Sequence, residues 1–191
     1  ANAIGSSVAI GTGAASTGMT YARTGVAIGA SAASSQDGTA VGPNAKARGI
    51  QSTLVGFNAT ANGNYAVALG DRTTANFYGA VAIGSSADAG AYATSMGISS
   101  NAGAIYALAL GYDAEAAAGA ENAVALGARS IADVPNTVSV GSSSMKRQIM
   151  HVAAGTRATD AVNLAQLQAA TGSGLVTYDD ATGVVSVAAG Q

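Results

Sequence analysis

Residues 67–84 read VALGDRTTANFYGAVAIG, and the glycines that close its two apolar tetrapeptides, Gly70 and Gly84, lie 14 residues apart. A glycine of this kind recurs through two-thirds of the chain. It stands at Gly11, Gly29, Gly42, Gly56, Gly70, Gly84, Gly97, Gly111, Gly127 and Gly141. A fixed period predicts a stack of similar coils rather than a globule folded around one centre. The longer gaps before Gly29 and Gly127 predict surface insertions, the second of them at residues 118–121.

Each of these glycines follows a short alternating pattern. The residues one and three positions before it are large and mostly apolar, and the residue between them is small, with Leu54 as the one exception. Because side chains alternate faces along a strand, the pattern predicts a strand with one large-residue face and one small-residue face. β-Branched residues at the outer position favour the same extended backbone.

The two faces receive different predicted roles. We expect the large face to fill the inside of each coil, through Val8, Ile10, Val26, Ile28, Val67, Leu69, Val81, Ile83, Leu108, Leu110, Val124 and Leu126. We expect the small face to meet other copies of the chain, through Ala9, Ala27, Ala40, Ala68, Ala82, Ala109 and Ala125. A smooth apolar face of this kind is typical of a surface made for another chain, so oligomerisation is predicted to be part of the fold.

A second alternation follows each glycine, three and five residues on, as at Ala45 and Ala47 around the polar Lys46. These small residues share one face of a second short strand, where a thin coil leaves room for little else. Each repeat therefore reads as strand, glycine turn, strand and loop. The predicted fold is all-β: a parallel β-roll of about ten 14-residue coils, stacked about 4.8 Å apart.

The chain changes character after the last repeat. Charged residues make up 9% of the chain, yet four of them fall within residues 146–160. Thr159 or Asp160 is predicted to cap a helix with an apolar stripe. A helix of about eleven residues is marginal alone, so we expect it to begin a coiled coil with partner helices.

Two sets of residues carry a family resemblance. The repeated Val-Ala-Ile-Gly units resemble the head repeats of trimeric autotransporter adhesins, the YadA-like surface fibres of Gram-negative bacteria. NTVSVG at 136–141, KRQI at 146–149, HVAAGT at 151–156 and TDAVNLAQL at 159–167 resemble the neck of that family. The neck match is the more specific, and the two together cover residues 1 to about 170.

The resemblance implies a left-handed β-roll, a homotrimer, and a neck that leads into a coiled-coil stalk. The expected domains are a head at 1–133, a neck at 134–170, and at 171–191 a linker with the start of a further module. The neck residues carried over by the resemblance are Lys146, Arg147, His151, Val152, Asp160, Val162, Asn163, Leu164 and Leu167. The family also implies a place on the bacterial cell surface, with the secretion signal and the outer-membrane anchor barrel expected outside this chain.

No catalytic, cofactor or metal site is predicted. The chain has no cysteine, its ten carboxylates are scattered, and its glycines do not form a phosphate-binding loop. The single histidine, His151, is expected to be structural, with a pH switch through three nearby copies as the alternative. A net charge of −2 argues against capture of nucleic acid or of an anionic membrane.

Three classes of function remain open. The first is adhesion, in which many weak contacts to host matrix proteins such as collagen, fibronectin or laminin act together. The others are a structural spacer within a fibre and an ice- or sugar-binding solenoid. Candidate contact residues are the aromatics Tyr21, Tyr65, Phe77, Tyr78, Tyr92, Tyr106 and Tyr112, which could equally pack between coils.

Overall fold

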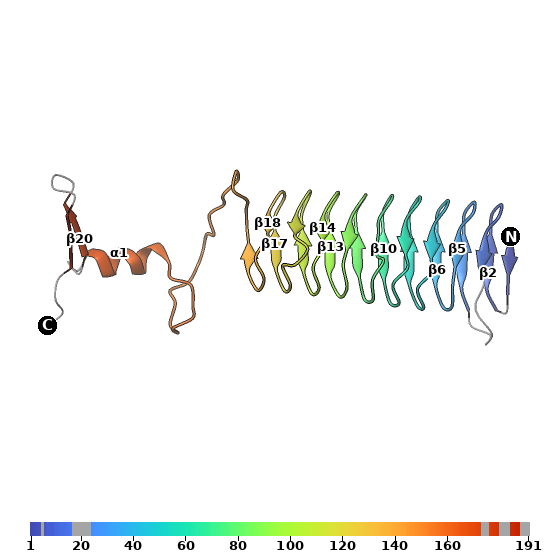
Figure 1. The fold of residues 1–191 in the computed structure, drawn as a ribbon, viewed down its shortest axis with the longest axis horizontal. Coiled ribbons are helices and arrows are strands. Elements are labelled where there is room, and N and C mark those ends of the chain that lie inside the picture. The colour runs from blue at the N-terminus through green and yellow to red at the C-terminus, as the bar shows by residue number, and fades with distance from the viewer. Residues whose placement is uncertain (5, 17–23, 173–175, 180–183, 188–191) are drawn as a thin grey trace. The chain divides into compact units, whose positions relative to one another are not determined.

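The computed structural model describes residues 1–4, 6–16, 24–172, 176–179 and 184–187 of the 191-residue chain. They fall into two compact units, residues 1–147 and residues 148–191. The first unit is a parallel β-roll whose coils stack along one axis (Figure 1). The predicted fold class is therefore confirmed. The insertion predicted before Gly29 falls outside the described residues.

One sheet of the roll contains the strand that precedes each glycine. Its ten strands are β2 (Val8–Ile10), β4 (Val26–Ile28), β6 (Thr39–Val41), β8 (Thr53–Val55), β10 (Val67–Leu69), β11 (Val81–Ile83), β13 (Thr94–Met96), β15 (Leu108–Leu110), β17 (Val124–Leu126) and β19 (Val138–Ser139). All neighbours pair in parallel, and equivalent repeat positions stand side by side, as in Val67 opposite Val81 and Leu69 opposite Ile83.

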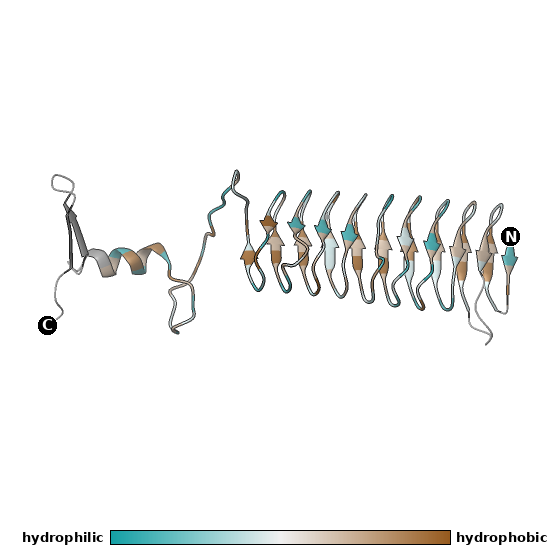
Figure 2. Ribbon diagram, in the orientation of Figure 1, coloured by the Kyte–Doolittle hydropathy of each residue, from teal (hydrophilic) through white to brown (hydrophobic). Residues whose placement is uncertain are grey.

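The strands that follow the glycines form the second wall of the roll and are only two residues long. They are β1 (Asn2–Ala3), β3 (Ala15–Ser16), β5 (Ala33–Ser34), β7 (Lys46–Ala47) and β9 (Thr60–Ala61), then β12 (Asp88–Ala89), β14 (Asn101–Ala102), β16 (Glu115–Ala116) and β18 (Ile131–Ala132). Single bridges from Thr74 to Thr60 and to Asp88 connect the two groups. Hydrophobic residues recur in strand after strand along the roll (Figure 2).

The inside of the roll is filled by small side chains from both sheets. Every described residue three or five positions after a repeat glycine, from Ala14 to Ala132, is buried, as predicted for the second strand. The central residue of the first strand is buried as well: Ala27, Ala40, Ala68, Ala82, Ala109 and Ala125 are 0% exposed. Leu54 at the same position is the largest side chain in this interior.

The predicted roles of the two strand faces are therefore wrong. The residues expected inside, Val8, Ile10, Val26, Ile28, Val67, Leu69, Val81, Ile83, Leu108, Leu110, Val124 and Leu126, are all exposed or half-buried on the outside. The alanines expected to meet other copies line the interior instead; only Ala9, in the first coil, is half-buried.

The thinness of the coil explains this reversal. The hydroxyl oxygens of Ser95 in β13 and Ser100, just before β14, hydrogen-bond to each other at 2.7 Å across the interior. Two serine side chains thus already span the gap between the sheets. A row of valine and isoleucine side chains facing that gap would overpack it, because protein interiors have no spare volume.

The repeat glycine allows the coils to approach closely. Gly84 has a φ of +127°, and a Cβ atom there would collide with the carbonyl group of Gly97 in the next coil. The insertion before Gly127 is accommodated at the surface, where Ala118 and Gly119 are exposed and Ala120 is buried.

The second unit contains an extended segment, the helix α1 (Leu164–Gly172), and an antiparallel pair formed by β20 (Val176–Asp179) and β21 (Val184–Val187). The helix begins later than the predicted caps. Asn163 is the N-cap: its Oδ1 accepts a hydrogen bond from the Gln166 amide at 3.0 Å, and its own amide donates to Gln166 Oε1 at 3.3 Å. This reciprocal pair is a capping box.

Asp160 closes the turn before the helix instead of capping it. Its carboxylate accepts hydrogen bonds from the amides of Thr156 at 3.1 Å and Arg157 at 3.0 Å. These two bonds hold the pKa of the Asp160 carboxyl below its usual value, because they stabilise the charged form.

Candidate functional site

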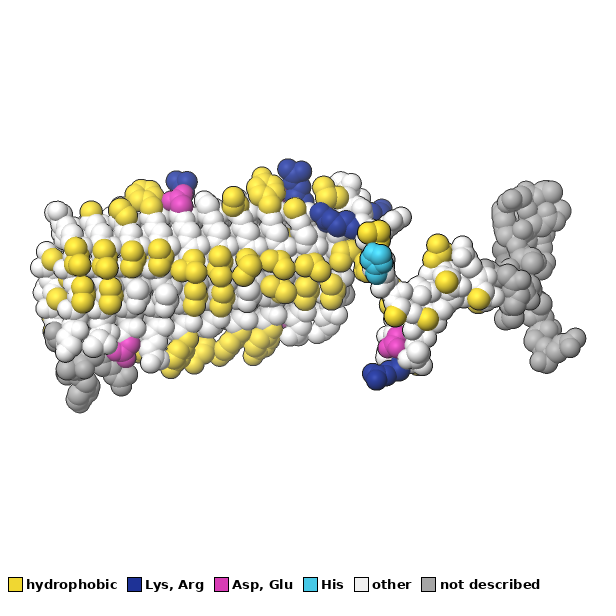
Figure 3. Space-filling view, turned by 180° about the vertical axis from the view of Figure 1, so that it is seen from behind, with side chains coloured by type: hydrophobic (Ala, Val, Ile, Leu, Met, Phe, Trp, Pro, Cys, Tyr) yellow, Lys and Arg dark blue, Asp and Glu magenta, His cyan; other side chains and the backbone are white. Residues whose placement is uncertain are grey.

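The most extensive feature on the roll surface is the outward side of the ten-stranded sheet. We call it the hydrophobic face; it consists of the residues one and three positions before the repeat glycines in β2 to β19. Figure 3 shows hydrophobic side chains in parallel rows along the roll. The parallel register places equivalent residues side by side, so the row one position before the glycines is apolar throughout, whereas the row three positions before them is interrupted by Thr39, Thr53 and Thr94. Exposed fractions are 57% at Ile10, 45% at Val55 and 43% at Leu126.

The outward side of the second sheet is more polar. Lys46, Asp88, Asn101 and Glu115 are exposed there, each between the two buried small residues of its second strand. The two sheets thus share one interior of small residues but differ in the surface that they offer.

The described part of the chain offers no candidate metal centre. Its residues contain no group of three or more histidine, cysteine, aspartate or glutamate side chains that could hold a metal ion. The neighbouring carboxylates Asp113 and Glu115 are both exposed. Asp71 forms an ion pair with the adjacent Arg72 at 2.9 Å. The helix in the described residues is too short to cross a membrane.

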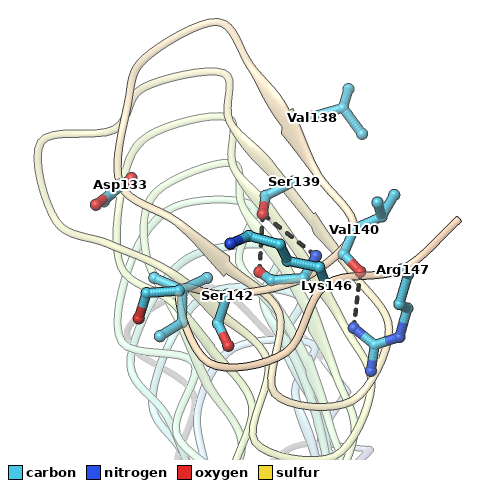
Figure 4. A pocket seen from close by; sticks show the side chains of 10 residues that line it. Asp133, Val138, Ser139, Val140, Ser142, Lys146 and Arg147 are labelled. Atoms are coloured by element: carbon cyan, nitrogen blue, oxygen red, sulfur yellow. Dashed lines mark hydrogen bonds between the residues drawn. The ribbon is translucent and has the colours of Figure 1, made fainter. Parts of the chain in front are cut away.

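The C-terminal end of the roll is closed by Arg147, one of the predicted neck residues. Its guanidinium group donates hydrogen bonds to the Val140 carbonyl at 2.7 Å, to Ser130 Oγ at 3.0 Å and to the Ala128 carbonyl. No further coil follows the last coil in the roll, so its polar groups have no next coil to pair with, and Arg147 pairs with them instead. Beside them lies an open hollow (Figure 4), which Ile131, Asp133, Val138, Ser139, Ser142 and Lys146 help to line.

Apart from Lys146, which lies beside Arg147 in the first unit, the other predicted neck residues belong to the second unit. The Asn163 side chain donates to the Val152 carbonyl at 3.1 Å, and Gln166 exchanges two hydrogen bonds with the backbone of Gly155. These bonds tie the extended segment to the start of α1. His151 is exposed, and Val162, Leu164 and Leu167 are 55–68% exposed. More than half of each of these three apolar side chains is therefore open to solvent in a single chain.

Four of the seven candidate aromatics form one row of contacting rings, in which the angle between neighbouring ring planes falls from 65° to 49° to 25° along the roll. Tyr65, Tyr78, Tyr92 and Tyr106 come from consecutive coils, and each pair of neighbouring ring centroids is 5.3 Å apart. Tyr112 lies apart from them, with the Arg129 guanidinium 5.6 Å from its ring centroid. Phe77 is 55% exposed, and Tyr21 falls outside the described residues. The sequence spacing suggested these contacts but did not decide which rings meet.

Comparison with known proteins identifies the family. Models of the YadA head domain repeat match residues 33–59, 55–73, 61–87, 89–114 and 118–144, and a model of the coiled stalk of trimeric autotransporter adhesin matches residues 148–190. The crystal structure of the collagen-binding domain of the Yersinia adhesin YadA is 32% identical, with a TM-score of 0.63; the match covers 87% of this chain and 98% of that one. The chain belongs to the YadA-like trimeric autotransporter adhesins.

None of the curated protein sequences compared with the chain matched it. The family is one of bacterial surface adhesins, which is not a class of enzymes, and the roll is an adhesin-like head. The stalk match begins at residue 148, where the second structural unit also begins. In a YadA-like adhesin, the hydrophobic face, the exposed aromatics and the neck are then the surfaces to consider for assembly and binding.

Proposed function

We propose that this chain is the head of a homotrimeric fibre, on the bacterial surface and anchored in the outer membrane, that attaches to host matrix. The observation that carries the proposal is the likeness to the YadA collagen-binding domain over nearly all of that domain. Residues 1–133 would be the head, residues 134–170 the neck, and residues 171–191 the start of the next module. Collagen is the first matrix protein to test, with fibronectin and laminin beside it.

The hydrophobic face supports assembly of the homotrimer. Soluble monomers rarely expose a contiguous apolar patch of more than a few hundred Å². Here Ile83 lies between Leu69 and Met96 of the neighbouring coils, and apolar residues continue in this row through coil after coil. A second and third copy of the same face would cover them. We take the number of subunits, three, from the family to which the chain belongs.

A double substitution tests this assembly. Val81→Asp with Ile83→Asp should leave the alanine interior intact but place six carboxylates in the centre of a trimer, where burying unpaired charge is costly. We expect sedimentation equilibrium to give the mass of a single chain, with circular dichroism still typical of β-structure. Lys46→Asp, on the polar side, should leave the mass of the trimer unchanged. A double variant that stays trimeric would contradict the assignment of this face.

Adhesion is tested with the purified trimer of the full chain. Type I collagen, fibronectin and laminin are immobilised separately, and binding is followed by surface plasmon resonance. Saturable binding to one of them supports the proposal. The apparent affinity should fall when the trimer is dissociated into single chains, because multivalency is then lost. Absence of saturable binding to all three would refute adhesion by this segment and favour a structural spacer.

A further inference from the structure

The row of four contacting tyrosines forms an unusual surface, which we call the tyrosine ladder: Tyr65, Tyr78, Tyr92 and Tyr106. All four lie in the turns that lead into the ten-stranded sheet, at one edge of the roll. Three steps of 5.3 Å place the outer two ring centroids about 16 Å apart along the roll. Hydrophobic side chains gather along the edges of the roll, beside the rows of the hydrophobic face (Figure 3).

The turns themselves do not require tyrosine. Tyr65, Tyr92 and Tyr106 have left-handed φ angles of 54–60°, which are uncommon for bulky residues. Asn122 and Asn136 occupy the same turn position in later coils, where asparagine adopts this conformation more readily. In the coil of Tyr78, a glycine takes the left-handed position and the tyrosine precedes it, yet its ring still lies in the stack. The row of rings is thus kept although the backbone position changes.

Stacking leaves much of each ring accessible. The four tyrosines are 47–60% exposed, and within the described part of the chain no hydrogen bond occupies their hydroxyl groups. Because each ring lies against its neighbours, the ring edges and hydroxyls are the parts that a ligand can reach. Phe77 and Ile105, in the same turns, are 55% and 45% exposed and widen the apolar surface.

This surface selects a class of ligand by its chemistry. The four turns, 62–66, 76–80, 90–93 and 104–107, contain no charged residue, which disfavours nucleic acid and polyanions as ligands. Sugars and bases stack on open aromatic faces. The two inner rings, Tyr78 and Tyr92, each have a neighbouring ring centroid 5.3 Å away on both sides, which leaves little room for a sugar or base to lie flat between them. What remains is a linear strip of apolar ring edges and hydrogen-bonding hydroxyls.

A polyproline II chain offers the complement of such a strip. It has no internal hydrogen bonds, so its carbonyl groups are available as acceptors, and its proline rings pack against aromatic side chains. With a rise of about 3.1 Å per residue, about five residues of such a chain would span the ladder. We propose that the tyrosine ladder is the surface of this head that binds proline-rich polyproline II strands, as they occur in a collagen triple helix. The inference rests on the proposed adhesion and assigns the binding of the matrix protein to the tyrosine ladder.

The test compares three forms of the full-length trimer. One variant replaces Tyr65, Tyr92 and Tyr106 with asparagine, which suits the left-handed turns. A second replaces the same three residues with phenylalanine, and Tyr112→Asn, outside the stack, is the matched control. The probe is a triple-helical peptide with ten Gly-Pro-Pro repeats, and sedimentation and circular dichroism establish that each trimer is intact.

We expect the asparagine variant to bind the peptide at least tenfold more weakly than the parent protein. The phenylalanine variant keeps the rings and lacks only the hydroxyls, so the logarithm of its affinity for the peptide should fall by about half as much as that of the asparagine variant. The Tyr112→Asn control should bind the peptide as the parent protein does. Should the asparagine variant fail to fold, the phenylalanine variant alone must still show weaker binding.

The outcomes separate this inference from the proposed function. Equal peptide binding by the parent and by a folded asparagine variant would overturn the ladder assignment and leave adhesion standing. Binding of the parent to fibronectin or laminin but not to the triple-helical peptide would do the same. If a β-1,4-linked oligosaccharide bound through the same tyrosines and the peptide did not, the ladder would be a glycan site. Absence of binding to every matrix protein would count against adhesion itself.

Discussion

Leu54 is the sharpest probe of what lies inside the roll. It is 0% exposed and occupies the position held by alanine or serine in the other coils. Leu54→Ala removes three carbon atoms from the interior. Buried Leu→Ala substitutions cost about 2–5 kcal/mol, and the lower end applies where the site can close on the cavity. The neighbouring Ala40 and Ala68 in register indicate that this coil can close partly, so we expect about 2–3 kcal/mol per chain.

The assay is thermal unfolding of the full chain by circular dichroism at several protein concentrations. For a chain of this size, about 2–3 kcal/mol corresponds to a fall in Tm of about 4–12 °C. Because Leu54 stabilises each roll internally, the fall should be the same at every concentration. The adjacent Val55, 45% exposed on the hydrophobic face, gives the contrast. Val55→Ala acts on association, so its effect on Tm should be largest at high protein concentration and should shrink as dilution dissociates the trimer.

One result would refute this reasoning. If Leu54→Ala melts like the parent protein and its trimer dissociates more readily in sedimentation, then Leu54 contacts another chain. The small-residue row would then lie between subunits, as the sequence pattern alone suggested.

Four further substitutions or titrations follow from the structure. Gly70→Val should lower Tm, because Gly70 has a φ of +143° and a Cβ there would lie 2.6 Å from the next coil's carbonyl group; strained backbone of this kind costs about 1–3 kcal/mol. Arg147→Gln should speed amide hydrogen exchange in the last coil by removing charged hydrogen bonds worth about 1–3 kcal/mol in total. Asn163→Ala should destabilise α1 by about 0.5–2 kcal/mol, seen as lost helical NMR shifts. The pKa of the Asp160 carboxyl is lower in the folded turn than in the unfolded chain. Its contribution to the stability of the turn is therefore present above the unfolded pKa and is lost as the pH falls through the folded pKa. The NMR shifts of the Thr156 and Arg157 amides should follow that acid transition, and Asp160→Asn should abolish it.

The sequence by itself determined the periodic architecture. The 14-residue glycine spacing required stacked coils, because a repeat can recur at one interval only where each unit meets equivalent neighbours. It also placed both strands of each coil, the small residues of the second strand and the surface insertion before Gly127. Local chemistry sufficed for these features, since strand alternation and turn glycines act over a few residues.

The choice between inside and outside in the first strand belonged to the tertiary structure. Alternation gives two faces to a strand such as Val81–Ile83 but does not say which of them meets the second sheet. That depends on the distance between the sheets, which the Ser95–Ser100 hydrogen bond reveals to be very short. The helix cap likewise depended on contacts over distance: Asn163 is fixed by Gln166 and by the backbone of Val152, eleven residues away.

The tyrosine ladder was equally a matter of three dimensions. The sequence contained the four tyrosines at intervals of 13 or 14 residues, but Tyr78 stands one turn position earlier than Tyr65 and Tyr92. Only the stacking of the coils brings that ring into the row, because side chains from separate turns meet when the backbone between them is wound at a fixed pitch.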